Sequence, residues 1–280
     1  MSSLDNVGIV GQGFVGTAVK EGIPSFMNTH TYDKYLKDKS SCNSIEELTE
    51  KSGIIFLCLP TPMHPDGSCD FSIVKDVVNK IDEFDNSNLI VLKSTVPPGT
   101  TESLNRECKN TRVVFNPEFL TEANFIEDFK NQNRIIIGGA HSAVTQIKNF
   151  YVKIFRDAII IKTNSTTAEC VKYFTNCFLA TKVSFANEFK QICDASGVDY
   201  DKVVEYALHD SRIGKTHLSV PGPDGYYGFG GSCFPKDINA IMHFAQANDI
   251  VSSVLNGAWE KNIEVRPDRD WENLKGRAVT

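Results

Sequence analysis

The sequence predicts an α/β fold: a Rossmann-type, doubly wound parallel sheet followed by an α-helical central domain. Three observations support this prediction. Short apolar runs alternate with helical stretches over the first half of the 280 residues, which is typical of parallel strands covered by helices on both faces. A glycine-rich turn follows the first apolar run, as it does in Rossmann folds. After Lys162 the sequence becomes helical in character.

Seven runs are expected to form the strands. Most are continuously apolar rather than alternating, as expected for strands that are buried on both faces. A helix through Val15, Ala18 and Val19 follows the first run, and Pro60 and Pro62 end the third. The runs lie at residues 7–10, 30–32, 54–59, 89–92, 112–115, 134–138 and 158–161.

A long helix is expected to open the second part of the chain. Thr166 and Glu169 have the spacing of a capping box, and Gly197 ends the helical pattern. We expect its apolar face to be buried against neighbouring helices or a partner subunit; this face consists of Val171, Phe174, Phe178, Phe185, Phe189 and Ile192. The predicted domains are therefore a Rossmann domain over residues 1–163 and a helical central domain over residues 164–280.

Composition argues against several classes of partner and location. The net charge of −6, from 29 basic and 35 acidic residues, is unlike that of proteins that bind nucleic acid or anionic membranes. No apolar run reaches the roughly 18 residues of a membrane span, and the N-terminus lacks the pattern of a signal peptide. The eight cysteines form no C-x-x-C pair and no His/Cys cluster with zinc spacing. We expect a cytoplasmic protein with reduced cysteines and no metal.

The glycine-rich turn predicts a dinucleotide site. It follows a strand and opens a helix, and its residues are Gly11, Gln12, Gly13, Phe14, Val15 and Gly16. The glycines allow close approach of a pyrophosphate to the helix N-terminus. Asp33, at the end of the next strand, is placed to bind the adenosine ribose and would repel the extra phosphate of NADP, which favours NAD. Lys37 can add a phosphate or ribose contact. The alternative is a glycine turn in an α/β protein that binds no nucleotide.

A second motif, GGSCFPKD at residues 230–237, predicts a reactive thiol. Pro235 suits the first turn of a helix, so Cys233 is expected at the helix N-terminus with Lys236 three residues on. Both features favour the thiolate, which is the nucleophilic form. Asp237 can order a water or accept a proton beside the sulfur. The preceding stretch, from Gly214 to Gly231, is expected to be a loop. An isolated cysteine is usually a small buried hydrophobe, but the flanking residues here favour the reactive interpretation.

Three further groups are candidates for polar chemistry. Lys172 and Asn176 share one face of the long helix and can stabilise an oxyanion, although such a pair is commonly a solvated face. Asn116 and Pro117 are expected to start a helix, with Glu118 and Glu122 on one face of it. The alternative interpretation is that those carboxylates only complement the helix dipole.

Thr95 is the remaining candidate, in the segment KSTVPPG at the end of a strand. Ligands bind at the carboxyl ends of strands in α/β sheets, so Thr95 can order a water or contact a cofactor. A plain turn is the alternative interpretation.

In combination, these motifs resemble the UDP-glucose/GDP-mannose dehydrogenase family. The motifs occur in the family's order along nearly the whole chain: GQGFVG, KSTVPPGT, NPEFLTEA, ECVKYFTNCFLATKVSFANE, DSRIG and PGPDGYYGFGGSCFPKD. The resemblance implies a four-electron oxidation of a sugar nucleotide by two NAD, with UDP-glucose giving UDP-glucuronate as the preferred reaction. The product would form through a thiohemiacetal and a thioester on the cysteine.

The resemblance also implies roles for individual residues. Cys233 matches the nucleophile, Lys172 and Asn176 the residues that stabilise the oxyanion, Asp237 the residue that orders water, and Glu118 the base for hydrolysis. Further matches are Thr95 to a threonine that binds water, Glu122 to a cofactor or active-site contact, and a set that contacts the sugar nucleotide: Phe119, Leu120, Arg212, Phe229 and Gly230. Lys236 is expected to contact the cofactor.

Three expectations concern organisation and alternatives. Residues 271–280 resemble the first residues of the third, UDP-binding domain of the family, so a short form without that domain is expected. The family dimerises through its long central helix, so a homodimer is expected. The alternatives are the same chemistry on GDP-mannose or a UDP-N-acetylhexosamine, a two-electron hydroxyacid dehydrogenase, and a non-catalytic chain that binds NAD.

Overall fold

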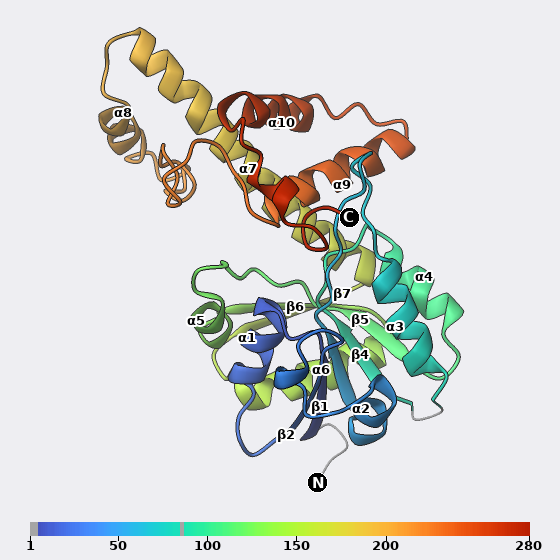
Figure 1. Cartoon of the computed structure of the whole chain (residues 1–280). Coiled ribbons are helices and arrows are strands. Elements are labelled where there is room, and N and C mark those ends of the chain that lie inside the picture. Colours follow the sequence, from blue (N-terminus) through green and yellow to red (C-terminus); the bar gives the residue numbers. More distant parts are fainter. Residues whose placement is uncertain (1–4, 85–86) are drawn as a thin grey trace. The chain divides into compact units, whose positions relative to one another are not determined.

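A computed structural model describes residues 5–84 and 87–280, and the chain divides into two compact units (Figure 1). The first unit comprises the chain up to Thr61 together with Phe71–Lys172. The second comprises Pro62–Asp70 and Tyr173–Thr280. The sequence did not indicate that Pro62–Asp70 belongs with the helical part of the chain. The division at residue 163 was predicted from sequence texture alone and stays a prediction.

The first unit contains a seven-stranded sheet in the order β2-β1-β3-β4-β5-β6-β7. Neighbouring strands are parallel except β5 and β6, which pair antiparallel at Phe115 and Gly138. The predicted α/β sheet is confirmed as a mostly parallel one, and its third strand ends at Leu57, earlier than expected. The strands are β1 (Asn6–Val10), β2 (Asn28–Tyr32), β3 (Ile54–Leu57), β4 (Leu89–Leu92), β5 (Arg112–Phe115), β6 (Arg134–Gly138) and β7 (Ile159–Thr163).

Helices cover both faces of this sheet, because successive strand side chains point to opposite faces. Phe56 packs on one face in a cluster with α1 and α6 residues, while Ile55 and Leu57 pack on the other with α2, α3 and α4 residues. The doubly wound arrangement is therefore confirmed. The helices are α1 (Phe14–Gly22), α2 (Ile45–Lys51), α3 (Ser72–Asp82), α4 (Thr100–Glu107), α5 (Phe125–Lys130) and α6 (His141–Ile154), with a 3₁₀ turn at η2 (Lys37–Lys39).

The helix predicted to begin at Asn116 is not observed. Residues 116–121 are irregular, and α5 begins only at Phe125. The Asn116 side chain makes tertiary hydrogen bonds and does not cap a helix. Its Oδ1 accepts from Lys93 Nζ at 2.9 Å, and its Nδ2 donates to the Ile136 carbonyl at 2.7 Å. Glu118 and Glu122 therefore do not share a helix face.

The long helix is confirmed as α7 (Ser165–Ala195), but its predicted capping box is wrong. Asn164 provides the cap, since its Oδ1 accepts from the Thr167 N–H at 2.7 Å. The Glu169 carboxylate accepts instead from the Gly99 and Thr101 N–H groups at 2.6 and 2.8 Å. The helix ends as predicted, with Gly197 at a φ of +69°.

The second unit is built from helices. Its core includes Ala180 of α7, Ile238 of α9, Ala258 of α10 and the loop residue Phe229. Besides the later part of α7 it contains α8 (Tyr200–Ala207), α9 (Phe234–Ala247), α10 (Ser253–Val265) and a 3₁₀ turn at η3 (Asp270–Asn273). Met63 joins this unit through backbone hydrogen bonds with Ala278 and Thr280 at 2.9 and 3.0 Å. Among the described residues, no helix has the length and apolar character needed to cross a membrane.

The phenylalanines of α7 are exposed rather than packed against other helices of this chain. Phe174, Phe178, Phe185 and Phe189 have exposed fractions of 74%, 58%, 61% and 37%, and Ile192 is 49% exposed. Of the two expected ways to cover this face, burial against the chain's own helices is therefore wrong. Only Val171 of the predicted face packs against a core, that of the first unit.

Candidate functional site

The glycine turn between β1 and α1 has the geometry that close approach to a ligand requires. Gly11 has a φ of +91°, and a Cβ there would collide with the Cys58 carbonyl. A Cβ on Gly16 would collide with the Gly11 carbonyl, so Gly16 allows α1 to pack against the turn. Gly13 precedes α1 directly and has no atom within 4 Å of a Cβ position, which leaves the helix N-terminus open. This opening suits a pyrophosphate.

Asp33 connects the glycine turn to the segment after β2. Its Oδ2 accepts from the Gln12 N–H at 2.7 Å, and its Oδ1 accepts from the Tyr35 and Leu36 N–H groups at 2.8 and 2.9 Å. Partial burial would raise the pKa of Asp33, but these donors and Lys37 outweigh burial and lower it. The carboxylate is thus held ionised beside the turn and keeps acceptor capacity for a hydroxyl.

A buried lysine that the sequence did not single out lies at the carboxyl ends of β4 and β5. Lys93 is 3% exposed, and Nζ donates to both the carbonyl and the Oδ1 of Asn116. Tyr151 also donates to this Oδ1, at 2.5 Å. Burial lowers the pKa of Lys93 to about 8, although Cys58 and Glu118 act in the opposite direction. The only signal in the sequence was a lysine directly after an apolar strand.

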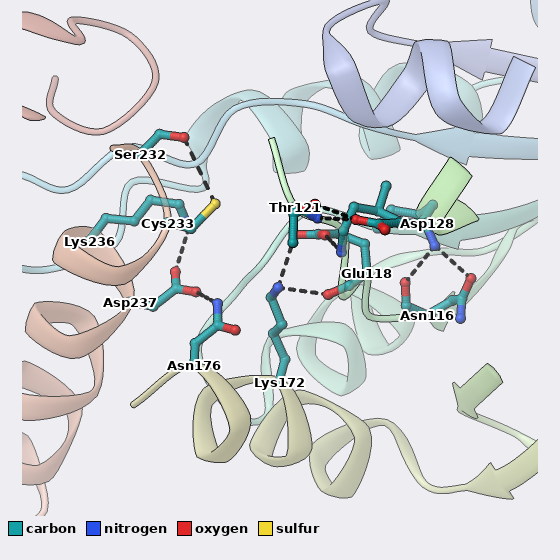
Figure 2. Close-up of polar contacts among 12 residues, drawn as sticks. Asn116, Glu118, Thr121, Asp128, Lys172, Asn176, Ser232, Cys233, Lys236 and Asp237 are labelled. Carbon is teal, nitrogen blue, oxygen red and sulfur yellow. Dashed lines mark hydrogen bonds and ion pairs between the residues drawn. The ribbon is translucent and has the colours of Figure 1, made fainter. Parts of the chain in front are cut away.

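Glu118 and Lys172 form a buried ion pair within the first unit. Lys172 Nζ donates to Glu118 Oε1 at 2.9 Å and to the Glu118 carbonyl at 2.7 Å (Figure 2). The side chains are 8% and 4% exposed. Burial would raise the pKa of Glu118, but the charge and hydrogen bond of Lys172 outweigh it and lower the pKa. Lys172 is therefore buried, and the solvated-face interpretation does not hold for it.

The neighbouring candidates differ in exposure. Thr95 is buried at 7%, whereas Glu122 is exposed. Phe119 and Leu120 are half-buried, and Lys172 Nζ lies 5.6 Å from the centre of the Phe119 ring.

In the second unit, Cys233 is confirmed at a helix N-terminus. It is the N-cap residue of α9, with Pro235 in the first turn. Its carbonyl accepts from the Asp237 N–H at 3.0 Å. The spacing of Cys233 and Pro235 was thus sufficient to predict that Cys233 lies at the helix N-terminus, because both residues belong to the same turn.

Asp237 is 1% exposed and holds two partners on its carboxylate. Asn176 Nδ2 donates to Oδ2 at 2.6 Å, and Lys236 Nζ donates to Oδ1 at 2.5 Å (Figure 2). Burial would lower the pKa of Lys236, but the charges of Asp237, Cys233 and Cys69 outweigh it and raise the pKa. The structure therefore gathers Cys233, Lys236, Asp237 and Asn176 into one group, with a cation and an amide donor beside the thiol.

The residues of the second unit that are expected to contact the sugar nucleotide differ in exposure. Phe229 is 4% exposed and packs in the helical core, and Gly230 follows it in the loop. Arg212 is 86% exposed in its side chain, and its guanidinium pairs with Asp210. The structure does not bring Arg212 to Cys233 through any hydrogen bond or ion pair between described residues.

Sequence reasoning missed three residues that hold the loop before Cys233. Asn262 bonds to both backbone groups of Phe229, and Asp270 accepts from the Gly231 N–H, while Arg266 donates to Asp270. No local motif marks them, because they act on a loop more than thirty positions earlier in the chain.

Comparison with known proteins identifies the family to which both parts of the chain are related. Residues 18–159 match the NAD binding domain of the UDP-glucose/GDP-mannose dehydrogenase family, and residues 166–264 match its central domain. The chain is 38% identical over 233 residues to UDP-glucose 6-dehydrogenase TuaD of Bacillus subtilis, a match that covers 80% of this chain and 49% of TuaD. It is 34% identical over 263 residues to UDP-glucose 6-dehydrogenase AglM of Haloferax volcanii, covering 88% of this chain and 60% of AglM.

A solved structure shows the same relationship. The chain resembles a UDP-glucose dehydrogenase from the archaeon Pyrobaculum islandicum with a TM-score of 0.83 and 30% identity, over 96% of this chain and 70% of that one. The chain spans about half the length of the curated relative TuaD. Because the family models together match most of its length, the chain belongs to the UDP-glucose/GDP-mannose dehydrogenase family and carries its NAD-binding and central domains.

Proposed function

We propose that this chain carries out the NAD-dependent oxidation of UDP-glucose to UDP-glucuronate with Cys233 as the nucleophile. The observation that carries the proposal is the position of Cys233 at the N-terminus of α9, beside Lys236 and Asp237. A thiol at a helix N-terminus near a cation is in the setting that favours the thiolate. Similarity to relatives that bear the name UDP-glucose 6-dehydrogenase supports the choice of substrate.

NAD fits the first unit. The open helix start at Gly13, with Gly11, Phe14, Val15 and Gly16 around it, suits the pyrophosphate, and Asp33 suits the adenosine ribose. Lys37, Thr95, Glu122 and Lys236 are proposed further contacts. When bound, an NAD would supply the acceptor for one hydride, so the two hydrides that the oxidation removes require two NAD in turn.

The cysteine makes a four-electron oxidation possible on one substrate. Removal of a hydride and a proton from the primary alcohol gives an aldehyde. The Cys233 thiolate adds to the carbonyl carbon, and the oxygen takes up a proton to give a thiohemiacetal. Loss of a second hydride and a proton gives a thioester. Water then breaks the carbon–sulfur bond, which yields the carboxylic acid and returns the thiol.

The surrounding residues have roles that match their contacts. Lys172 and Asn176 lie one turn apart on α7 and would stabilise negative charge on the sugar oxygen. Asp237, which Asn176 and Lys236 hold in place, would order the water. Glu118, which Lys172 keeps ionised, would accept the proton of the hydrolytic water. We propose that Phe119, Leu120, Arg212, Phe229 and Gly230 contact the sugar nucleotide.

The test follows NADH absorbance with NAD and one of three substrates: UDP-glucose, GDP-mannose or UDP-N-acetylglucosamine. The expected result is two NADH per UDP-glucose and loss of turnover in Cys233→Ala. Cys170→Ala removes an exposed cysteine of α7 and serves as the matched control, with turnover retained. Faster turnover with either of the other substrates would reassign the substrate. Turnover by Cys233→Ala at the wild-type rate would favour a two-electron dehydrogenase instead, and binding of NAD without any turnover would favour a binding protein.

We also propose that the exposed apolar face of α7 joins two copies of this chain. Phe174 and Phe178 stack on each other with ring centres 6.1 Å apart, and Phe185 pairs with Phe189 at 5.7 Å. Such a continuous apolar face is costly to leave in water and is typical of an interface. Sedimentation equilibrium should show a dimer at micromolar concentration that Phe178→Glu disrupts. Phe26→Glu, an exposed phenylalanine of the first unit, is the control. A wild-type monomer would contradict the proposal.

A further inference from the structure

Asn262 of α10 holds the backbone of the loop that precedes Cys233. Its Oδ1 accepts from the Phe229 N–H at 2.7 Å, and its Nδ2 donates to the Phe229 carbonyl at 3.0 Å. Both polar atoms of one side chain are thus used on the two backbone groups of one residue. Asn262 is fully buried. Asn187 of α7 adds a third bond, since its Oδ1 accepts from the Gly228 N–H at 3.1 Å.

Arg266 and Asp270 hold the next part of the same loop. Asp270 Oδ2 accepts from the Gly231 N–H at 2.9 Å, two residues before Cys233. Arg266 Nε donates to the other carboxylate oxygen of Asp270 at 2.7 Å, and its Nη1 donates to Asp224 Oδ2 at 2.9 Å. The Arg266 side chain is 5% exposed, whereas its partners Asp270 and Asp224 are 39% and 45% exposed, so these charge-assisted bonds join a buried guanidinium to partly exposed carboxylates.

The loop glycines are fitted to these side chains. A Cβ on Gly228 would collide with Asn262 Oδ1, and a Cβ on Gly230 would collide with Asp270 and Arg266. Gly228 also has a φ of +67°, which disfavours other residues. The backbone of residues 228–231 therefore lies directly against the Asn262, Arg266 and Asp270 side chains. A glycine-rich loop has much conformational freedom to lose, and these bonds restrict it.

We propose that Asn262, Arg266 and Asp270 are positioning residues that fix the loop 228–232 and thereby aim the Cys233 thiol for attack. This inference rests on the proposed role of Cys233. The positioning residues need not touch the substrate, because they act through the backbone of the loop. Displacement of a reacting group by about 1 Å can reduce a catalysed rate by about 10²-fold, so a loosened loop should affect the chemical step more than cofactor binding.

The experiment compares Asn262→Leu with the wild-type chain in NADH formation from UDP-glucose. We expect kcat to fall by about 10²-fold, while the KM for NAD stays within about twofold, because the glycine turn and Asp33, which are proposed to bind the pyrophosphate and the adenosine ribose, lie in the first unit. Asn88→Leu is the matched control: Asn88 is a 2% exposed asparagine that bonds to two carbonyls of the first unit. It should keep the wild-type kcat.

Milder variants keep the test decisive if Asn262→Leu does not fold. Asp270→Ala removes the acceptor of the Gly231 N–H from a side chain that is 39% exposed, and Arg266→Lys retains a cation beside Asp270. We expect Asp270→Ala to lower kcat and Arg266→Lys to retain more activity than Arg266→Met. Variants of Asn262 and Asp270 that fold and turn over at the wild-type kcat would overturn the proposal.

A second readout separates this inference from the proposed function. The rate of iodoacetamide alkylation at Cys233, measured by mass spectrometry of its peptide with the Cys170 peptide as reference, reports the setting of the thiol without substrate. If the wild-type chain shows no turnover, the proposed function fails, and the alkylation rate alone then decides whether Asn262 positions the Cys233 thiol. A changed Cys233 rate in Asn262→Leu, with an unchanged Cys170 rate, would support positioning, whereas identical rates at Cys233 would overturn it.

Discussion

At the residue scale, Glu118 and Lys172 form an ion pair in which both partners are buried. Removing a charge from water is costly, and the close opposite charge compensates for that cost only while both groups are ionised. The pair therefore makes the stability of the first unit depend on the protonation of one carboxylate.

This dependence gives a prediction about acid. The pKa of Glu118 is lower in the folded chain than its ordinary value of 4.5, so its contribution is present above that value and is lost as the pH falls through the folded pKa. The unfolding free energy of the wild type should exceed that of Glu118→Gln at pH 7, and this difference should shrink below pH 4.5. Urea titrations of both proteins at several pH values provide the measurement. A difference that stays constant with pH would show that ionisation of Glu118 does not contribute to stability.

Asp33 allows a second prediction at this scale. Its carboxylate is held by three backbone N–H groups beside the glycine turn, and we expect it to bind the adenosine ribose. Asp33→Ala should weaken NAD binding by about 10- to 100-fold, since a hydrogen bond to a charged group contributes about 1.5–3 kcal/mol. Isothermal titration calorimetry measures the Kd, with the exposed Asp38→Ala as control. Equal affinity in Asp33→Ala and wild type would remove Asp33 from the cofactor site.

At the element scale, the start of α7 is set by Asn164 and not by the predicted Thr166–Glu169 capping box. Loss of an N-cap side chain costs about 1 kcal/mol. Asn164→Ala should therefore lower the unfolding free energy by about that amount, whereas Thr166→Ala should have a much smaller effect. Urea unfolding of the two variants side by side makes the comparison. A larger loss of unfolding free energy in Thr166→Ala than in Asn164→Ala would instead support the capping box.

Glu169 connects α7 to the start of α4. Its two carboxylate oxygens accept from Gly99 and Thr101, and burial raises its pKa. Glu169→Gln leaves only one acceptor and directs an amide N–H₂ at the remaining N–H group. Leaving a buried group unsatisfied costs about 1–3 kcal/mol. The melting temperature should fall in Glu169→Gln and stay near the wild-type value in Glu102→Gln, an exposed glutamate of α4. Equal melting temperatures would show that the connection is unimportant.

Local patterns in the sequence predicted those elements whose causes are local. The strands follow from apolar runs, and the position of Cys233 follows from Pro235 two residues later. The helix predicted at Asn116 was wrong because the Asn116 side chain accepts a hydrogen bond from Lys93, a tertiary partner, and does not cap a helix. Asn262 could not be found at all, since it holds a loop that is distant in sequence.

At the scale of the whole molecule, family membership and the geometry of each unit support the same proposed chemistry. The first unit provides an open glycine turn and the Glu118–Lys172 pair, and the second provides Cys233 with Lys236 and Asp237. The resemblance extends through both matched domains, while TuaD and AglM are longer than the chain. In the proposed reaction, the second oxidation takes place while the sugar is bound covalently to Cys233.

The most direct test of this covalent step is mass spectrometry of Cys233 after reaction. Glu118→Gln, which should slow thioester hydrolysis, is mixed with NAD and UDP-glucose and quenched in acid. We expect the Cys233 peptide to gain the mass of a UDP-glucuronyl acyl group, and omission of NAD to prevent the gain. Formation of NADH without any adduct on Cys233 in either Glu118→Gln or the wild type would contradict covalent catalysis by Cys233.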